Sequence, residues 1–316
     1  MRAVPDALRA RPFTRPQALE AGLTSRMLEG KRFIRVFPGV WRHADHELTE
    51  SDWVEAGRLA LPDSVHLTGL SRLRQLGLDF GPQWPLRFVI EGDHHAAIEG
   101  VFLHRTRKLA PTDDVGVTPA AAFISYAARA RVIDLVKVGD WLLHRGHITL
   151  EEVRELALSA LWREGAHEAV WILDHLDARA RSLKESETRS VLVFSGLQPP
   201  DVNATVPVGE NVTVIGDLVY RRWRTVVEYE GSQHQEDRDQ YVADLDRYAL
   251  MRGAGITYVQ VTHEKLAHAR TLVGEVFRAL VANGYVGPPP GFGGQWRLLF
   301  APVSAAVGPR SRRAVG

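Results

Sequence analysis

The clearest pattern of apolar and polar positions is a pair of short apolar runs separated by a polar tip. The runs are Leu218–Tyr220 and Thr225–Tyr229, rich in Val, Thr and Tyr, with Arg221–Arg224 between them. Short β-branched and aromatic runs on either side of a polar tip predict the two strands of a hairpin. With a two-residue loop at the centre of the tip, Asp217 pairs with Glu228 across the strands.

The same hairpin carries three acidic side chains on one face. Directly paired residues have Cβ atoms about 5 Å apart, and like charges at that separation repel. Glu230 follows Glu228 by two residues and therefore points to the same face of its strand. Grouped carboxylates on an apolar hairpin are costly without a cation, and Mg²⁺ prefers carboxylate oxygens and water. The pattern therefore indicates a divalent metal bound by Asp217 and Glu228.

The first 45 residues have the spacing of a small helix-turn-helix. Thr14 and Gln17 form a capping-box pattern for a helix that ends at Gly22, and a second helix is expected over Arg26–Lys31. The alternating stretch FIRVFPGVWRH (33–43) then predicts a two-stranded wing. This order is that of a winged helix-turn-helix.

Residues 46–181 change from mixed to helical patterning. An amphipathic helix is expected at Glu50–Leu61. Residues 85–92 and 100–108 alternate like two strands joined by a hairpin tip, where Asp93, His94 and His95 are expected to be solvated turn residues. From Thr118 onward, apolar residues recur at helical spacing.

From Ser182 to about residue 283 the pattern gives the order α-β-β-β-α-β-α. Ser182 and Glu185 form a capping box, so Glu187 lies near the start of the first helix. In the second helix, Arg247 is expected on a solvated face, paired with Asp244. The Gly/Pro-rich residues 284–316 are expected to form a partly disordered tail. The elements expected after the first helix are Val202–Val206, Val212–Tyr220, Thr225–Glu230, Arg238–Arg252, Ile256–Val261 and Ala267–Asn283.

Composition excludes several classes of chemistry. The 316 residues are enough for two or three domains, and 45% hydrophobic with 24% charged residues is within the globular range. The absence of cysteine excludes disulfides, thiolate zinc sites and a cysteine nucleophile. Without a signal-peptide pattern or an apolar run of about 18–20 residues, we expect a cytoplasmic protein.

The net charge of +1 hides an uneven distribution. Basic residues outnumber acidic ones within the first 45 residues, which suits contacts with DNA phosphates. A small domain that holds a protein partner is the alternative. The residues expected to contact DNA lie on the second helix and the wing: Ser25, Arg26, Lys31, Arg32, Arg35 and Arg42.

The run from Asp217 through VVEYEG (226–231) to Gln233 and His234 resembles the Vsr-related domain-of-unknown-function 559 group, within the PD-(D/E)XK nuclease fold. SETRSVLVFSGLQPPDVNATV (186–206) and DRDQYVADLDRYALMRGAGITYVQVT (237–262) extend the resemblance over roughly residues 182–283. It implies hydrolysis of DNA phosphodiester bonds with Mg²⁺ or Mn²⁺ as cofactor. The resemblance implies catalytic roles for Glu187, Asp217 and Glu228, and we expect Glu230 and His234 to join them in the site. Glu230 stands where the family has Lys, so the role of this Lys in activating water falls to His234 or Glu230.

The stretch TRPQALEAGLTSRMLEGKRFIRVFPGVWR (14–42) is similar to the N-terminal domain of AbiEi-type antitoxins, and the middle of the chain is similar to their central part. This resemblance implies binding to the protein's own promoter and a cognate toxin as partner. The expected fold class is α/β of the α+β type. The expected divisions are 1–45, winged helix-turn-helix; 46–181, mixed and helical; 182–283, nuclease-like; and 284–316, tail.

Two functions are consistent with these patterns. One is a metal-dependent DNA endonuclease-like enzyme that the winged helix-turn-helix delivers to DNA. The other is an antitoxin or transcriptional repressor whose nuclease-like domain is catalytically inactive. A scaffold that touches neither DNA nor metal is a third hypothesis.

Overall fold

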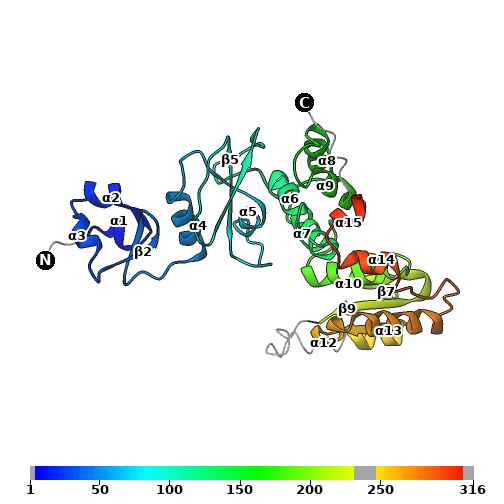
Figure 1. Ribbon diagram of the computed structural model, residues 1–316. Coiled ribbons are helices and arrows are strands. Elements are labelled where there is room, and N and C mark those ends of the chain that lie inside the picture. The colour runs from blue at the N-terminus through cyan, green and yellow to red at the C-terminus, as the bar shows by residue number, and fades with distance from the viewer. Residues whose placement is uncertain (1–3, 231–246, 309–316) are drawn as a thin grey trace. The chain divides into compact units, whose positions relative to one another are not determined.

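The computed structural model describes residues 4–230 and 247–308, and the chain divides into two compact units, residues 1–125 and 126–316 (Figure 1). Both units contain helices and sheets, and the fold class is α+β, as expected. Within the described ranges, no helix has both the length and the apolar character required to cross a bilayer.

The first unit begins with a small helical and stranded group. Its order is α1 (Asp6–Arg9), β1 (Phe13–Thr14), α2 (Arg15–Glu20), α3 (Ser25–Leu28), β2 (Phe33–Phe37) and β3 (Val40–His43). Thr14 and Gln17 form the expected capping box, and the strands lie in the order β1-β3-β2. Buried Phe13 and Phe33 meet edge to face, 5.8 Å apart, in the core beneath α2 and α3.

The rest of this unit contains a second three-stranded sheet. The helices are α4 (Glu50–Leu59) and α5 (Gly69–Arg74), and the strands β4 (His66–Leu67), β5 (Leu86–Glu91) and β6 (Val101–Thr106). Strands β5 and β6 pair in parallel, so the expected hairpin between them was wrong. Residues 92–100 form a crossover connection, on which Asp93, His94 and His95 are exposed. Alternation reveals a strand but not its direction relative to its neighbour.

The second unit begins with helices. These are α6 (Pro119–Ala127, which begins in the first unit), α7 (Val132–His144), α8 (Leu150–Ser159), α9 (Ala166–Ile172), the 3₁₀ turn η1 (Leu173–His175) and α10 (Leu183–Phe194). Two ion pairs join α7 to α10: Lys137 with Glu187 at 3.0 Å, and Asp140 with Arg189 at 2.8 Å. Because Asp140 is fully buried, this second pair fixes the helices in one register.

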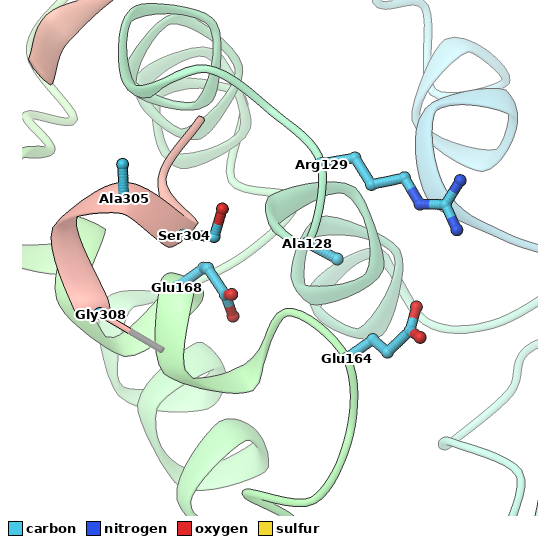
Figure 2. A pocket seen from close by; sticks show the side chains of 7 residues that line it. All are labelled: Ala128, Arg129, Glu164, Glu168, Ser304, Ala305 and Gly308. Atoms are coloured by element: carbon cyan, nitrogen blue, oxygen red, sulfur yellow. The ribbon is translucent and has the colours of Figure 1, made fainter. Parts of the chain in front are cut away.

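The C-terminal segment packs onto these helices. Helix α14 (Gly294–Leu299), red in Figure 1, contacts α7 and α10, and buries Leu299 completely. Helix α15 (Ser304–Val307) packs against α9, beside a cavity lined by Ala128, Arg129, Glu164, Glu168, Ser304, Ala305 and Gly308 (Figure 2). Residues 294–307 are therefore ordered parts of the unit, whereas 309–316 of the expected tail lie outside the described residues.

A four-stranded sheet completes the unit, in the order β10-β9-β8-β7. Its strands are β7 (Asp201–Gly209), β8 (Val212–Tyr220), β9 (Thr225–Tyr229) and β10 (Thr257–Val261), and only the β9–β10 pair is parallel. Helix α10 packs on β8 and β9, and α13 (Ala269–Ala282), preceded by α12 (His263–Ala267), packs on β9 and β10. The helical residues 247–253 pack on the sheet through Met251, which contacts Val219 and Val226.

Candidate functional site

The register expected for the β8–β9 hairpin is confirmed. Leu218 pairs with Val227, and Tyr220 pairs with Thr225. Extending this register by one residue places Asp217 opposite Glu228. The connection is the 3₁₀ turn η2 (Arg221–Trp223) followed by Arg224, whose φ of 45° is left-handed. The loop is therefore longer than the expected two residues but preserves the same pairing.

Asp217 is a half-buried carboxylate with an unusual pKa. Burial and the nearby charge of Glu185 raise its pKa to about 6. The main-chain N–H of Tyr229, which donates to Asp217 Oδ2 at 3.1 Å, and the guanidinium groups of Arg247 and Arg181 oppose this rise. The raised pKa shows that negative charge at this position is under-compensated by the surrounding protein.

The acid of α10 that acts on Asp217 is Glu185. Its Oε2 accepts hydrogen bonds from the Arg181 N–H at 2.9 Å and from Asn203 Nδ2 at 2.6 Å. The sequence suggested Glu187 instead. The structure places the Glu187 carboxylate 3.0 Å from both Lys137 Nζ and Lys184 Nζ. Although burial raises the pKa of Glu187, these two lysines outweigh it and the net pKa is lowered.

Glu228 is 2% exposed and lies at the centre of the sheet. Its Oε2 accepts from Arg247 Nη2 at 2.5 Å, and Arg247 Nη1 donates to the carbonyl of Ile215 at 3.3 Å. Arg247 was expected on a solvated face with Asp244, which lies outside the described residues. One sequence signal did point toward the sheet: Arg247 precedes the buried Met251 by four residues, so the two share a helix face.

Glu230, at the position of the family's Lys, is held by neutral donors. The Tyr248 hydroxyl, the Tyr258 hydroxyl and Gln260 Nε2 all donate to its carboxylate, the second at 2.7 Å. Burial raises the pKa of Glu230, but these three hydrogen bonds outweigh it and leave the pKa lowered. Burial together with the bond to Glu230 raises the pKa of Tyr248 to about 12. Glu230 is therefore ionised and fixed in place at neutral pH.

The polar residues form a row across all four strands. Gln260 pairs with Glu228 in the parallel ladder of β9 and β10. On β7, Val202 pairs with Leu218 and Ala204 pairs with Gly216, which places Asn203 beside Asp217. The φ of Asn203, 47°, departs from strand geometry. The row is thus Asn203, Asp217, Glu228 and Gln260. His234 and Gln233, which the sequence added to this site, lie outside the described residues.

The donor chemistry of the row fits a hard divalent cation. Oxygen atoms of Asp217 and Glu228 come from adjacent strands, and Mg²⁺ is usually held by one or two carboxylates plus water. Among the described residues, no three His, Asp or Glu side chains are placed to share one ion. An ion here would thus be held chiefly by Asp217 and Glu228. The charge of Glu185, which acts on Asp217, would add to the negative potential at the ion.

The expected DNA-contacting residues of the first unit differ in exposure and in their contacts within the protein. Arg26, Lys31 and Arg35 are exposed. Ser25 Oγ accepts from Arg15 Nη2 at 2.7 Å. Arg42, by contrast, is half-buried, and its Nη1 donates to the carbonyls of residues 43, 44 and 46. Arg32 is also half-buried, with its guanidinium 5.8 Å from the centre of the Phe33 ring.

Comparison of the chain with protein-family models, with curated proteins and with solved structures gave no match. The resemblances described above therefore depend on the quoted residues alone.

Proposed function

We propose that this chain is a DNA-binding protein whose C-terminal sheet carries a metal-dependent endonuclease site that hydrolyses phosphodiester bonds. The observation that supports this most directly is Asp217. It is a half-buried acid with a pKa of about 6, influenced by Glu185 and placed across the hairpin from Glu228. Such an arrangement disfavours a full set of ionised carboxylates unless a cation joins them.

Each acidic residue has a distinct role in this proposal. Asp217 and Glu228 hold Mg²⁺ or Mn²⁺, which when bound neutralises developing charge and lowers the pKa of water. Glu185 adds the negative potential that attracts the cation. Glu230 accepts hydrogen bonds from the hydroxyl groups of Tyr248 and Tyr258 and holds them in place. These two side chains form the edge of the site beside β10.

The first unit supplies the proposed DNA contact. Exposed cations surround α2, α3 and the β2–β3 wing, and exceed the exposed acids of the same segment. The exposed cations are Arg9, Arg11, Arg15, Arg26, Lys31 and Arg35, against Asp6, Glu20, Glu29 and Asp45. Because phosphate contacts dominate affinity for DNA, a surface with this excess of cations suits DNA binding.

The test is nicking of supercoiled plasmid by the full chain in Mg²⁺ or Mn²⁺. Asp217→Asn removes the central charge with little change of shape, and it should lower the nicking rate by roughly 100-fold or more. Asp201→Asn is the matched control, because Asp201 is an acid of the same sheet that pairs with the exposed Arg221. Absence of nicking by the wild type, or equal nicking by Asp217→Asn, contradicts the proposal.

A second function is favoured by a different observation. Glu228 already contacts Arg247, and Glu230 occupies the position of the family's Lys with three donors bound to it. These contacts suit a repressor or antitoxin whose nuclease-like domain does not cut. It predicts metal-independent binding to the protein's own promoter and, for an antitoxin, a cognate toxin as partner. Equal mobility shifts with that promoter and with random DNA would remove this candidate.

A further inference from the structure

We propose that Arg247 is a built-in counter-ion of Glu228 that competes with the divalent cation for this carboxylate. The inference rests on the proposed metal-dependent function of the same site. The contact between Arg247 Nη2 and Glu228 Oε2, at 2.5 Å, uses an oxygen that the metal would need. In the structure the guanidinium therefore supplies the positive charge that the cation supplies when it binds.

Burial explains why a counter-ion is needed. The Glu228 side chain is only 2% exposed, and an ionised carboxylate is costly at such a position without a cation. Arginine is suited to this role because its guanidinium keeps its proton at all ordinary pH values. A metal that approaches Glu228 thus meets a site that is already neutralised.

The two partners differ in their freedom to move. Glu228 belongs to β9, which pairs with β8 on one side and β10 on the other, so its position is fixed by the sheet. Arg247 reaches the carboxylate through a flexible side chain that is 31% exposed. Its hydrogen bond to the Ile215 carbonyl, at 3.3 Å, is long and joins a neutral acceptor. Exchange therefore moves the Arg247 side chain and leaves the sheet in place.

The neighbouring residue keeps the helix in place during this exchange. Tyr248 donates to Glu230, which directly follows β9, so consecutive residues of the helix bind the carboxylates of Glu228 and Glu230. Met251, one turn later, is fully buried against Val219 and Val226. When the Arg247 contact is lost, Tyr248 and Met251 still connect the described part of the helix to the sheet.

The test is thermal unfolding of the full chain during a Mn²⁺ titration without DNA. Arg247→Gln should melt at a lower temperature than the wild type in metal-free buffer, because Glu228 loses its counter-ion. Mn²⁺ should then raise its melting temperature more steeply, with half-saturation at roughly tenfold lower Mn²⁺ than for the wild type. Arg221→Gln removes the same charge from an exposed pair with Asp201 and should behave like the wild type.

The Mn²⁺ titration shows whether Arg247 competes with the metal for Glu228. If Arg247→Gln does not fold without metal, Mn²⁺ should restore cooperative unfolding, and failure to do so overturns the proposal. Equal half-saturation in the wild type and Arg247→Gln overturns it too, while leaving the proposed nuclease function intact. No response to Mn²⁺ in either protein removes the metal site itself. A stronger response in Arg247→Gln, without nicking by the wild type, supports the counter-ion role and contradicts only the nuclease function.

Discussion

The main-chain N–H of Tyr229 donates a hydrogen bond to Asp217 Oδ2 at 3.1 Å, which fixes the acid of β8 to the end of β9. This bond favours the ionised carboxylate, yet the pKa of Asp217 is still about 6 because burial and Glu185 act in the opposite direction. The folded protein therefore holds an acid whose charged form is less favoured than that of an ordinary aspartate. This unfavourable charge lies in the site that we propose binds a cation.

The first prediction concerns the pH dependence of stability. Between pH 4 and pH 6 the folded chain keeps a proton on Asp217 that the unfolded chain has released, so stability falls as pH rises through this window. Asp217→Asn removes this loss. It should be more stable than the wild type at pH 7.5, by at most roughly 3 kcal/mol, and similar to it near pH 4. Urea unfolding of both proteins at the two pH values measures this difference in stability. An equal difference at pH 7.5 and near pH 4 contradicts the prediction.

The second prediction concerns the residue before Asp217. A Cβ at Gly216 would lie 2.7 Å from Val226 Cγ1 and 2.9 Å from Val219 Cγ2, closer than side-chain atoms approach. Gly216→Ala should therefore destabilise the protein by about 1–3 kcal/mol through overpacking. Gly209→Ala on the neighbouring strand is the control, because its nearest neighbour is 3.6 Å away. Equal urea midpoints for the two variants would show that the sheet adjusts freely.

The third prediction separates two arginines of the first unit. Arg26 is exposed on α3, so Arg26→Gln should weaken DNA binding and reduce the slope of log affinity against log salt by about one. Arg42 instead donates to three main-chain carbonyls. Arg42→Gln should chiefly lower the melting temperature and leave the salt slope unchanged. A lost salt slope in Arg42→Gln, with normal stability, would place Arg42 on the DNA surface instead.

Local patterns in the sequence correctly predicted the pairing of the β8–β9 hairpin and the helix start at Thr14. The pairing of Leu218 with Val227 follows from alternation and a short polar tip, and the cap at Thr14 follows from its spacing to Gln17. Both depend on residues that are close in the chain. The position of Asp217 opposite Glu228 could be predicted for the same reason.

Contacts between distant elements were not predictable in this way. The parallel pairing of β5 and β6, the packing of α14 against α7 and α10, and the contact of Arg247 with Glu228 each join segments separated in sequence. Periodicity shows which side of an element is apolar, but not which neighbour covers it. A charged residue such as Arg247 is then assigned to solvent unless its partner is known.

The fourth prediction concerns the two acids of α10, which the sequence could not separate because they are only two residues apart. Glu185 acts on Asp217, whereas Glu187 contacts Lys137 and Lys184. Glu185→Gln should therefore lower the pKa of Asp217 and weaken Mn²⁺ binding. Glu187→Gln should leave both unchanged and lower stability instead by about 1–3 kcal/mol, since Lys137 is a mostly buried partner. Carboxylate titration by NMR and Mn²⁺-dependent melting distinguish these results. If Glu187→Gln alone weakened Mn²⁺ binding, the position suggested by the nuclease family would be the functional one.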